Sequence, residues 1–224
     1  MHLIPLLEAM ETMGLIVHLG LWARGVRDRF LGAALWRDAE SLEDAGHLVA
    51  RWLREDLLYL PWDYSLLPYK ETREAEGFAE AMAKVNDLGV VTLFSQPGIS
   101  YQRECVALTM TECRLPLVQS VAHEVGVVVE MTPDSPPAIR EATPVSIGPK
   151  GRPCTRLGAY RKSVAVQNFG CGSRRLKVDV KRGKYALLTL YDEQFARRGR
   201  VQEVLERLAV RLQAEGGQDE TLPQ

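Results

Sequence analysis

The sequence predicts a mixed α/β fold of the α+β kind, with helices packed on a largely antiparallel sheet. Several segments place apolar residues at three- and four-residue spacings, which is typical of amphipathic helices. Other segments are β-branched and apolar or alternate apolar with polar residues, which indicates strands. Short turn sequences containing Gly or Pro separate several of these strands, and such turns favour antiparallel pairing.

The composition is that of a globular protein with one hydrophobic core. The chain has 224 residues, of which 46% are hydrophobic and 25% charged, and its formal net charge is −1. These values exclude a disordered chain, a collagen-like chain and a protein that is basic throughout. The longest uncharged stretch near the N-terminus, Thr12–Ala23, has twelve residues, whereas a membrane span needs roughly 20. The first residues also lack the pattern of a signal peptide, so we expect a cytoplasmic protein that does not enter a membrane.

Helices dominate the predicted first part of the chain. Residues 3–22 carry an apolar stripe at helical spacing, so residues 1–34 are predicted to form an N-terminal helical extension. This extension serves either as a homodimer contact or as an ordinary core helix. Ser41 opens the next helix, which we expect to reach about residue 53, because its hydroxyl accepts unpaired backbone N–H groups. A further helix is expected over residues 71–87, ended by Gly89.

The middle of the chain changes to an extended pattern. Residues 90–94 predict a buried strand that ends at the turn sequence Ser95-Gln96-Pro97-Gly98, and residues 102–111 predict an antiparallel return strand. A helix over residues 117–125 and a strand over residues 127–131 follow. Residues 133–158 are rich in Pro and Gly, and we expect them to be mostly loop.

The last part of the chain predicts a β-meander and a helix. The three strands of the meander are expected over residues 162–168, 175–181 and 185–191. The final amphipathic helix is expected over residues 201–213. One α/β domain is therefore predicted over residues 35–215, with a flexible tail over residues 216–224.

Positive charge is concentrated in the predicted meander. Residues 150–184 carry eleven Lys or Arg and one acidic residue, whereas the rest of the chain has a net charge of −11. The middle strand and its turns place several of these cations on one outer face of the sheet: Arg174, Arg175, Lys177, Lys181 and Arg182. Such a basic face indicates binding of nucleic acid or an acidic partner. Ordinary pairing with the acidic remainder of the chain is the competing and favoured interpretation, and both stay open.

The cysteines and histidines predict neither a metal site nor a cofactor site. The four Cys and four His are scattered, and no two Cys have the spacing of a zinc ligand pair. We therefore expect no metal and no cofactor.

Two motifs carry a resemblance to a known family. The first is Trp36-x-x-Ala39-x-Ser41-Leu42-x-Asp44-x-Gly46, and the second is Ser95-Gln96-Pro97-Gly98 followed by Gln102-Arg103. In these motifs the chain resembles an uncharacterised actinobacterial domain of unknown function. Near the C-terminus the match is looser: Phe195-Ala196-Arg197 stands where similar sequences read closer to Trp-Gly-Arg. The resemblance implies no activity, but it directs attention to the polar residues of the second motif.

The preferred functional prediction is a small-molecule-binding domain for an anionic or nucleotide-like ligand. If the two central strands pair, their polar residues meet at one end of the sheet, where amides and a guanidinium suit an anion. The predicted ligand site consists of Ser95, Gln96, Gln102 and Arg103, with Asp192 as a further polar contributor. A purely structural turn is the competing interpretation. An enzyme of unassigned class that uses Ser95 or Asp192 in the same pocket, and an interaction protein that uses the basic face, are the alternative functions.

Overall fold

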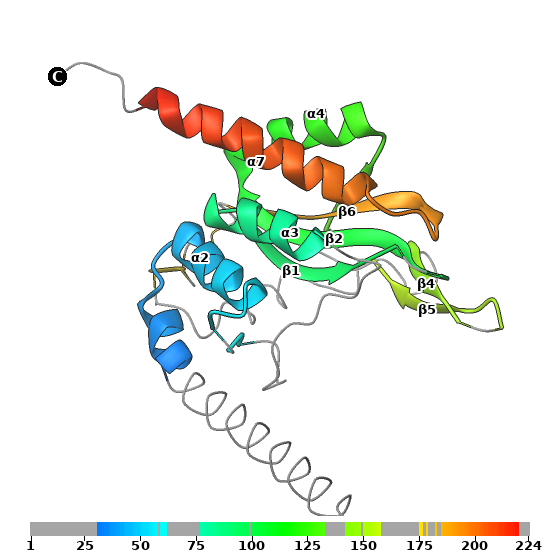
Figure 1. Cartoon of the computed structure of the whole chain (residues 1–224), viewed down its shortest axis with the longest axis horizontal. Coiled ribbons are helices and arrows are strands. Elements are labelled where there is room, and N and C mark those ends of the chain that lie inside the picture. Colours follow the sequence, from blue (N-terminus) through cyan, green and yellow to red (C-terminus); the bar gives the residue numbers. More distant parts are fainter. Residues whose placement is uncertain are drawn as a thin grey trace, which may run out of the picture.

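The protein is an α+β domain built on one antiparallel sheet, as the sequence predicts. The computed structural model describes residues 31–57, 59–61, 77–98, 100–132, 142–148, 150–157, 175, 176, 178, 182 and 185–219. The main sheet has four strands in the order β1-β2-β6-β3: β1 (Val91–Gln96), β2 (Arg103–Thr111), β6 (Tyr185–Phe195) and β3 (Val128–Met131). The helices named in Figure 1 are α2 (Leu42–Leu53), α3 (Phe78–Asp87), α4 (Leu115–Val125) and α7 (Arg200–Asp219). Residues 31–38 are also helical and contain the fully buried Trp36.

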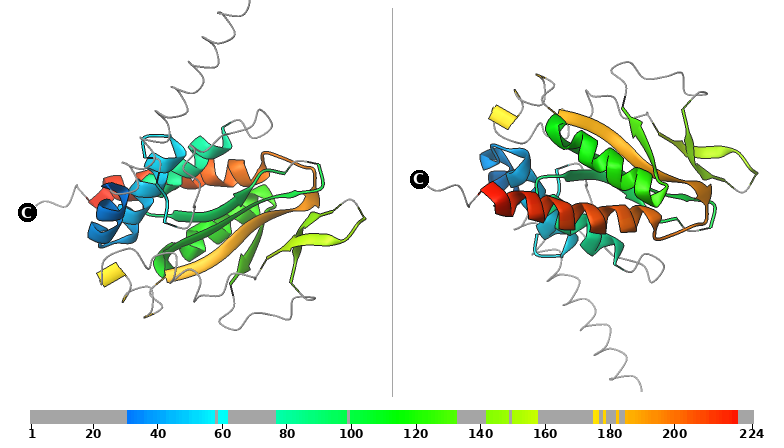
Figure 2. Two further views of the ribbon diagram at one scale, coloured as in Figure 1. Left: turned by 90° about the horizontal axis from the view of Figure 1, so that it is seen from below. Right: turned by 90° about the horizontal axis from the view of Figure 1, so that it is seen from above.

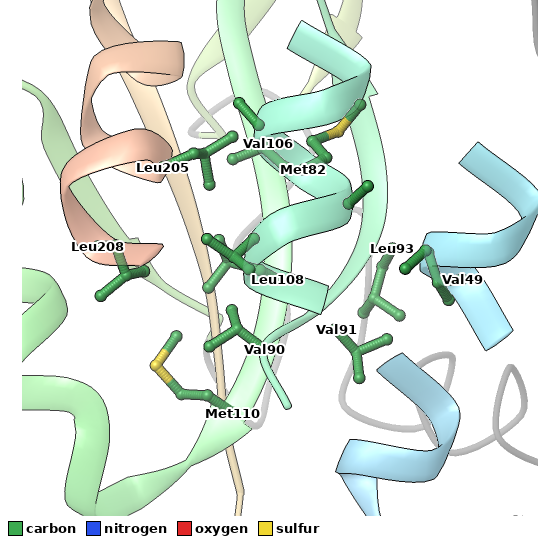
Figure 3. Packing of buried hydrophobic residues seen from close by; sticks show 14 of the residues in the cluster. Val49, Met82, Val90, Val91, Leu93, Val106, Leu108, Met110, Leu205 and Leu208 are labelled. Carbon is green, nitrogen blue, oxygen red and sulfur yellow. The ribbon is translucent and has the colours of Figure 1, made fainter. Parts of the chain in front are cut away.

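Helices α3 and α7 cover one face of the main sheet. Val106 pairs with Leu190 and Leu108 with Leu188 across β2 and β6, and all four side chains are fully buried in the main core. Figure 3 shows how Met82 of α3 and Leu205 and Leu208 of α7 converge on the β2 side chains of this face. Since successive strand residues point to opposite faces, the residues between them lie on the other face of the sheet.

A small hairpin packs against that second face. Strands β4 (Pro144–Ile147) and β5 (Pro153–Arg156) form a two-stranded antiparallel sheet. Figures 1 and 2 show this hairpin beside the end of the main sheet at which β2 begins. A second core fills part of the space between the two sheets, and it consists of Cys105, Val145, Leu157 and Tyr191. We call this set the intersheet core.

Most predicted elements are confirmed. Ser41 begins α2 with a capping box, in which its hydroxyl accepts the N–H of Asp44 while the Asp44 carboxylate accepts the N–H of Ser41. β1 and β2 pair antiparallel, and α4 ends at Gly126. The final helix extends further than predicted, to Asp219.

The predicted loop over residues 133–158 is corrected by β4 and β5. Both strands begin with a proline, and the register of their pairing shifts twice. Proline is compatible with the first residue of a short strand, so the density of Pro and Gly did not exclude strands here.

The predicted strand over residues 175–181 is also wrong at the positions that the structure describes. Arg175, Leu176 and Val178 are helical, and the N–H of Arg182 donates to the carbonyl oxygen of Val178 at 2.9 Å, four residues back. Leu176 is fully buried in the main core. Over so few residues, apolar spacing does not separate a strand from a helix, and the β-branched residues misled the prediction.

Several predictions lie outside the described residues. They concern the N-terminal extension up to residue 30, the first predicted meander strand over residues 162–168, and the chain beyond residue 219. The same holds for three members of the predicted basic face: Arg174, Lys177 and Lys181.

A close contact between α2 and α3 explains a glycine of the first motif. A Cβ atom at residue 46 would overlap the carbonyl oxygen of Asn86 on α3. Asn86 is itself fixed, because its fully buried side-chain amide donates to the carbonyl of Met82 and to the hydroxyl of Thr92, each at 2.8 Å. The backbone of α3 is therefore held in place, and only glycine fits at position 46.

We expect Gly46→Ala to lower the free energy of unfolding by about 2–3 kcal/mol, the usual cost of overpacking a core. Chemical denaturation measures the change. Gly126→Ala is the control, because the added methyl group meets no atom within 4 Å and only the positive φ of 77° opposes it. A loss at Gly46 no larger than at Gly126 would contradict the helix-contact argument.

Candidate functional site

Gln96 and Arg103 lie at the same end of the β1–β2 pair, where the side chain of Gln96 contacts the backbone of Arg103. The Gln96 side-chain amide donates to the carbonyl of Arg103 at 3.1 Å and to the carbonyl of Val145 at 2.9 Å. Gln96 is only 7% exposed. Its amide therefore joins β1, β2 and β4, and both observed donations go to the backbone.

Ser95 lies on the opposite face of the sheet from Gln96. Directly paired residues of an antiparallel sheet point to the same side. Ser95 pairs with Val106, which belongs to the helix-covered face, whereas Gln96 pairs with Cys105 of the intersheet core. Within the described residues no His or acidic side chain is hydrogen-bonded to Ser95.

Gln102 connects three parts of the fold through its backbone. It forms an isolated antiparallel bridge with Ser146 of β4, and its carbonyl oxygen accepts the N–H of Ala196 at 2.9 Å. The side chain is partly buried. Gln102 thus lies beside Arg103 at the predicted place.

Arg103 carries a guanidinium that stacks on two aromatic rings. Its Cζ lies 4.6 Å from the ring centroid of Phe195 and 5.7 Å from that of Tyr191. The Nε atom is buried and has no hydrogen-bond partner among the described residues. Burial raises the pKa of Tyr191, and a hydrogen bond with Thr143 opposes that rise while fixing the ring. Arg103 is therefore held by stacking.

Asp192 is fully buried and paired within the fold. Its carboxylate accepts hydrogen bonds from Nε and Nη2 of Arg197, the latter at 2.7 Å. It also accepts one from the N–H of Gln194 at 2.8 Å. This bidentate pair fixes the segment between β6 and α7. Asp192 and Ser95 therefore do not meet in the described structure.

Glu104 is an important polar residue that the sequence analysis missed. Its carboxylate accepts the N–H of Gly199 at 3.0 Å and that of Val201 at 2.8 Å, at the N-terminus of α7. Burial raises the pKa of Glu104, while these backbone donors oppose the rise. Helix capping by a residue so distant in the sequence leaves no local motif, so no sequence signal pointed to it.

The turn after β1 packs against the same β6–α7 segment. A Cβ atom at residue 98 would overlap the carbonyl oxygen of Arg197. Gly98 of the second motif is thus explained by a close backbone approach.

A pocket of about 250 Å³ lies between the main sheet and the hairpin, and the sequence analysis did not predict it. Its described lining residues are Leu93, Phe94, Ala107, Thr132, Val145, Cys154, Thr155, Arg156, Leu157, Leu187 and Thr189. The hairpin that forms one wall of this pocket lies within residues 133–158, which the sequence analysis predicted to be loop.

The described members of the predicted basic face do not form a strand surface. Arg175 makes an exposed ion pair with Glu40 at 3.3 Å, and Arg182 is exposed. The pair joins the basic segment to the acidic first part of the chain, as the interpretation by ordinary pairing expects.

Within the described ranges, the His, Cys, Asp and Glu side chains form no group of three that would hold a metal ion. Among the described helices, none has the length and apolar character that crossing a membrane requires.

The fold and these sites define a class of protein: an α+β domain with an antiparallel sheet, helices α3 and α7 on one face, and a stacked arginine and a pocket toward the other. The family of the domain of unknown function DUF6919 matches residues 32–211, and the chain belongs to it. A search of curated proteins found no match.

We expect Glu104→Ala to lower the free energy of unfolding by about 2–4 kcal/mol, because it leaves two backbone N–H groups of the α7 N-terminus unpaired. Urea denaturation measures this loss. Glu112→Ala, an exposed position just after β2, is the matched control and should change stability by less than about 0.5 kcal/mol. Equal losses in the two variants would contradict the capping role.

Ala196→Gly should stabilise the protein. Ala196 has a φ of 58°, a left-handed conformation that costs a residue with a side chain roughly 1–2 kcal/mol. Glycine removes this strain but loses more entropy on folding, so we expect a net gain of about 0.5–1 kcal/mol. Ala34→Gly within the helical residues 31–38 is the control and should destabilise. A lower thermal midpoint for Ala196→Gly would refute the strain argument.

Proposed function

We propose that this domain binds a small anionic ligand, a carboxylate or a phosphate, through the guanidinium of Arg103. The observation that carries the proposal is the stacked guanidinium whose buried Nε has no acceptor among the described residues. A buried donor without an acceptor costs free energy. An anion that accepts from this edge removes the cost.

The stacking supports selectivity for groups that present two oxygens side by side. Phe195 and Tyr191 hold the plane of the guanidinium, so less rotational freedom is lost when a ligand binds. Arginine presents its donors as a rigid fork that matches the two oxygens of a carboxylate or phosphate. Lysine would supply charge at the same place without this fork.

Two neighbouring acidic groups, Asp192 and Glu104, already have partners. Asp192 accepts from Arg197, and Glu104 accepts from the backbone of α7. These contacts keep two nearby carboxylates from pairing with Arg103 and support its availability for an external anion.

Arg103→Gln should abolish stabilisation by inorganic phosphate and by citrate. A ligand at ten times its Kd adds about 1.4 kcal/mol to the free energy of unfolding, which raises the thermal midpoint by roughly 3–5 °C in a chain of this size. The measurement is the thermal midpoint with each anion against chloride at equal ionic strength. Arg152→Gln, an exposed arginine of the β4–β5 hairpin, is the matched control and should keep the full rise.

The proposal fails if Arg103→Gln keeps the anion-dependent rise, or if the parent protein shows none. Native mass spectrometry of gently purified protein gives a second readout, because a retained small anion appears as a discrete added mass. That mass should be absent from Arg103→Gln and present in Arg152→Gln.

A further inference from the structure

We propose that the anion bound by Arg103 is an aromatic carboxylate and that its ring stacks on Tyr101. This inference rests on the proposed function, because it names the ligand class of the same site. The observation that carries it is an aromatic side chain left in solvent two residues before Arg103: Tyr101 is 67% exposed.

Tyr101 and Arg103 lie on the same face of the sheet. Gln102, the residue between them, forms an antiparallel bridge with Ser146 of β4, and on its other side its carbonyl accepts the N–H of Ala196 at 2.9 Å. Because successive residues of a paired, extended chain point to opposite faces, Tyr101 and Arg103 project to one side. Two residues along a strand span about 6.6 Å, so the two side chains start as close neighbours on that face.

Ile147 of β4 extends the apolar surface at Tyr101. Its N–H donates to the carbonyl of Tyr101 at 3.0 Å, one position along from the bridge between β2 and β4. Directly opposed residues of antiparallel strands point to the same side, so Ile147, which is partly exposed, lies beside Tyr101. The same register places Val145 opposite Arg103, and the membership of Val145 in the intersheet core agrees with this assignment of faces.

The ring of Tyr101 is available to a ligand. Within the described part of the chain, its side chain makes no hydrogen bond and no ring contact. Arg103 takes its aromatic support from Phe195 and Tyr191, both of β6. A tyrosine ring offers a large, rigid contact surface whose ordering costs little entropy. An aromatic ligand can therefore cover it while its anion meets the guanidinium.

The short spacing selects the kind of aromatic anion. Since Tyr101 and Arg103 are adjacent on one strand face, the ring and the anion of the ligand must also be adjacent. In an aromatic carboxylate the carboxyl group is bonded directly to the ring, and its two oxygens match the donor fork of an arginine. A saturated acid of the same size has the same charge and a similar apolar area, but no flat π face to stack on tyrosine.

The probes are 2-naphthoate and its saturated analogue decahydro-2-naphthoate, whose dissociation constants isothermal titration calorimetry measures. We expect the parent protein to bind 2-naphthoate about fivefold more tightly, because an aromatic pair contributes more than its buried area alone. Tyr101→Ala should weaken binding of 2-naphthoate by about the same factor and remove the preference, whereas Tyr101→Phe should keep it.

Two further variants serve as controls. Val210→Ala is the matched control, because Val210 of α7 is also 67% exposed; it should change neither dissociation constant. Arg103→Gln should lose binding of both acids. Tyr101→Ala should retain the rise of the thermal midpoint with inorganic phosphate, because phosphate has no ring and depends on Arg103 alone. Substitutions at positions as exposed as Tyr101 and Val210 leave the fold intact.

The outcomes separate this inference from the proposed function. If phosphate raises the thermal midpoint through Arg103 but the parent binds the two acids equally, the inference is overturned and the proposed function stands. If neither phosphate nor either acid binds, both are overturned. The inference also fails if Tyr101→Ala binds 2-naphthoate like the parent, if Val210→Ala weakens binding to the same extent, or if Arg103→Gln retains it.

Discussion

The buried carboxylate of Glu104 is the constraint on which the arrangement around the candidate sites depends. The Glu104 side chain extends from the central strand β2, and its carboxylate accepts the backbone N–H groups of Gly199 and Val201 at the N-terminus of α7. α7 packs on α3 and α4 as well as on the sheet, so this one residue joins the start of the strand to the helical layer. The anion-favouring end of a helix offsets part of the cost of burying the charge. Arg103, the neighbour of Glu104 in the sequence, begins the same strand, β2.

Most polar residues of the second motif use their hydrogen-bonding groups to build the end of the sheet. Arg103 alone keeps a buried side-chain donor, Nε, without an acceptor among the described residues. Gln96 joins three strands, Gly98 admits the backbone of Arg197, and Gln102 bonds to Ala196. These contacts account for each of them without a ligand. Arg103 is different, because its backbone takes part in the sheet while its buried Nε lacks an acceptor within the described residues. Under the proposed function, the second motif is therefore largely a structural frame around one ligand-binding side chain.

Sequence reasoning succeeded where the determinants were local. The capping pair Ser41–Asp44, the β1–β2 pairing and the meeting of Gln96 with Arg103 all follow from neighbouring residues. It failed where contacts joined distant segments. Glu104 caps a helix 97 residues away, and the pocket requires a hairpin whose two strands have four residues each. The stacking of Arg103 on Phe195 likewise depends on a β6 bulge that no spacing reveals.

The two faces of the sheet differ because of side-chain size. On the helix-covered face, Val106, Leu108 and Met110 of β2 are large enough to meet the helices and leave the core filled. On the other face the same strand presents Cys105, Ala107 and Thr109, and the small β4–β5 hairpin packed there does not fill the whole space. The intersheet core fills one part of it and leaves the pocket beside Ala107. The alternation of large and small residues along β2 therefore accounts for a filled core on one face and for the pocket on the other.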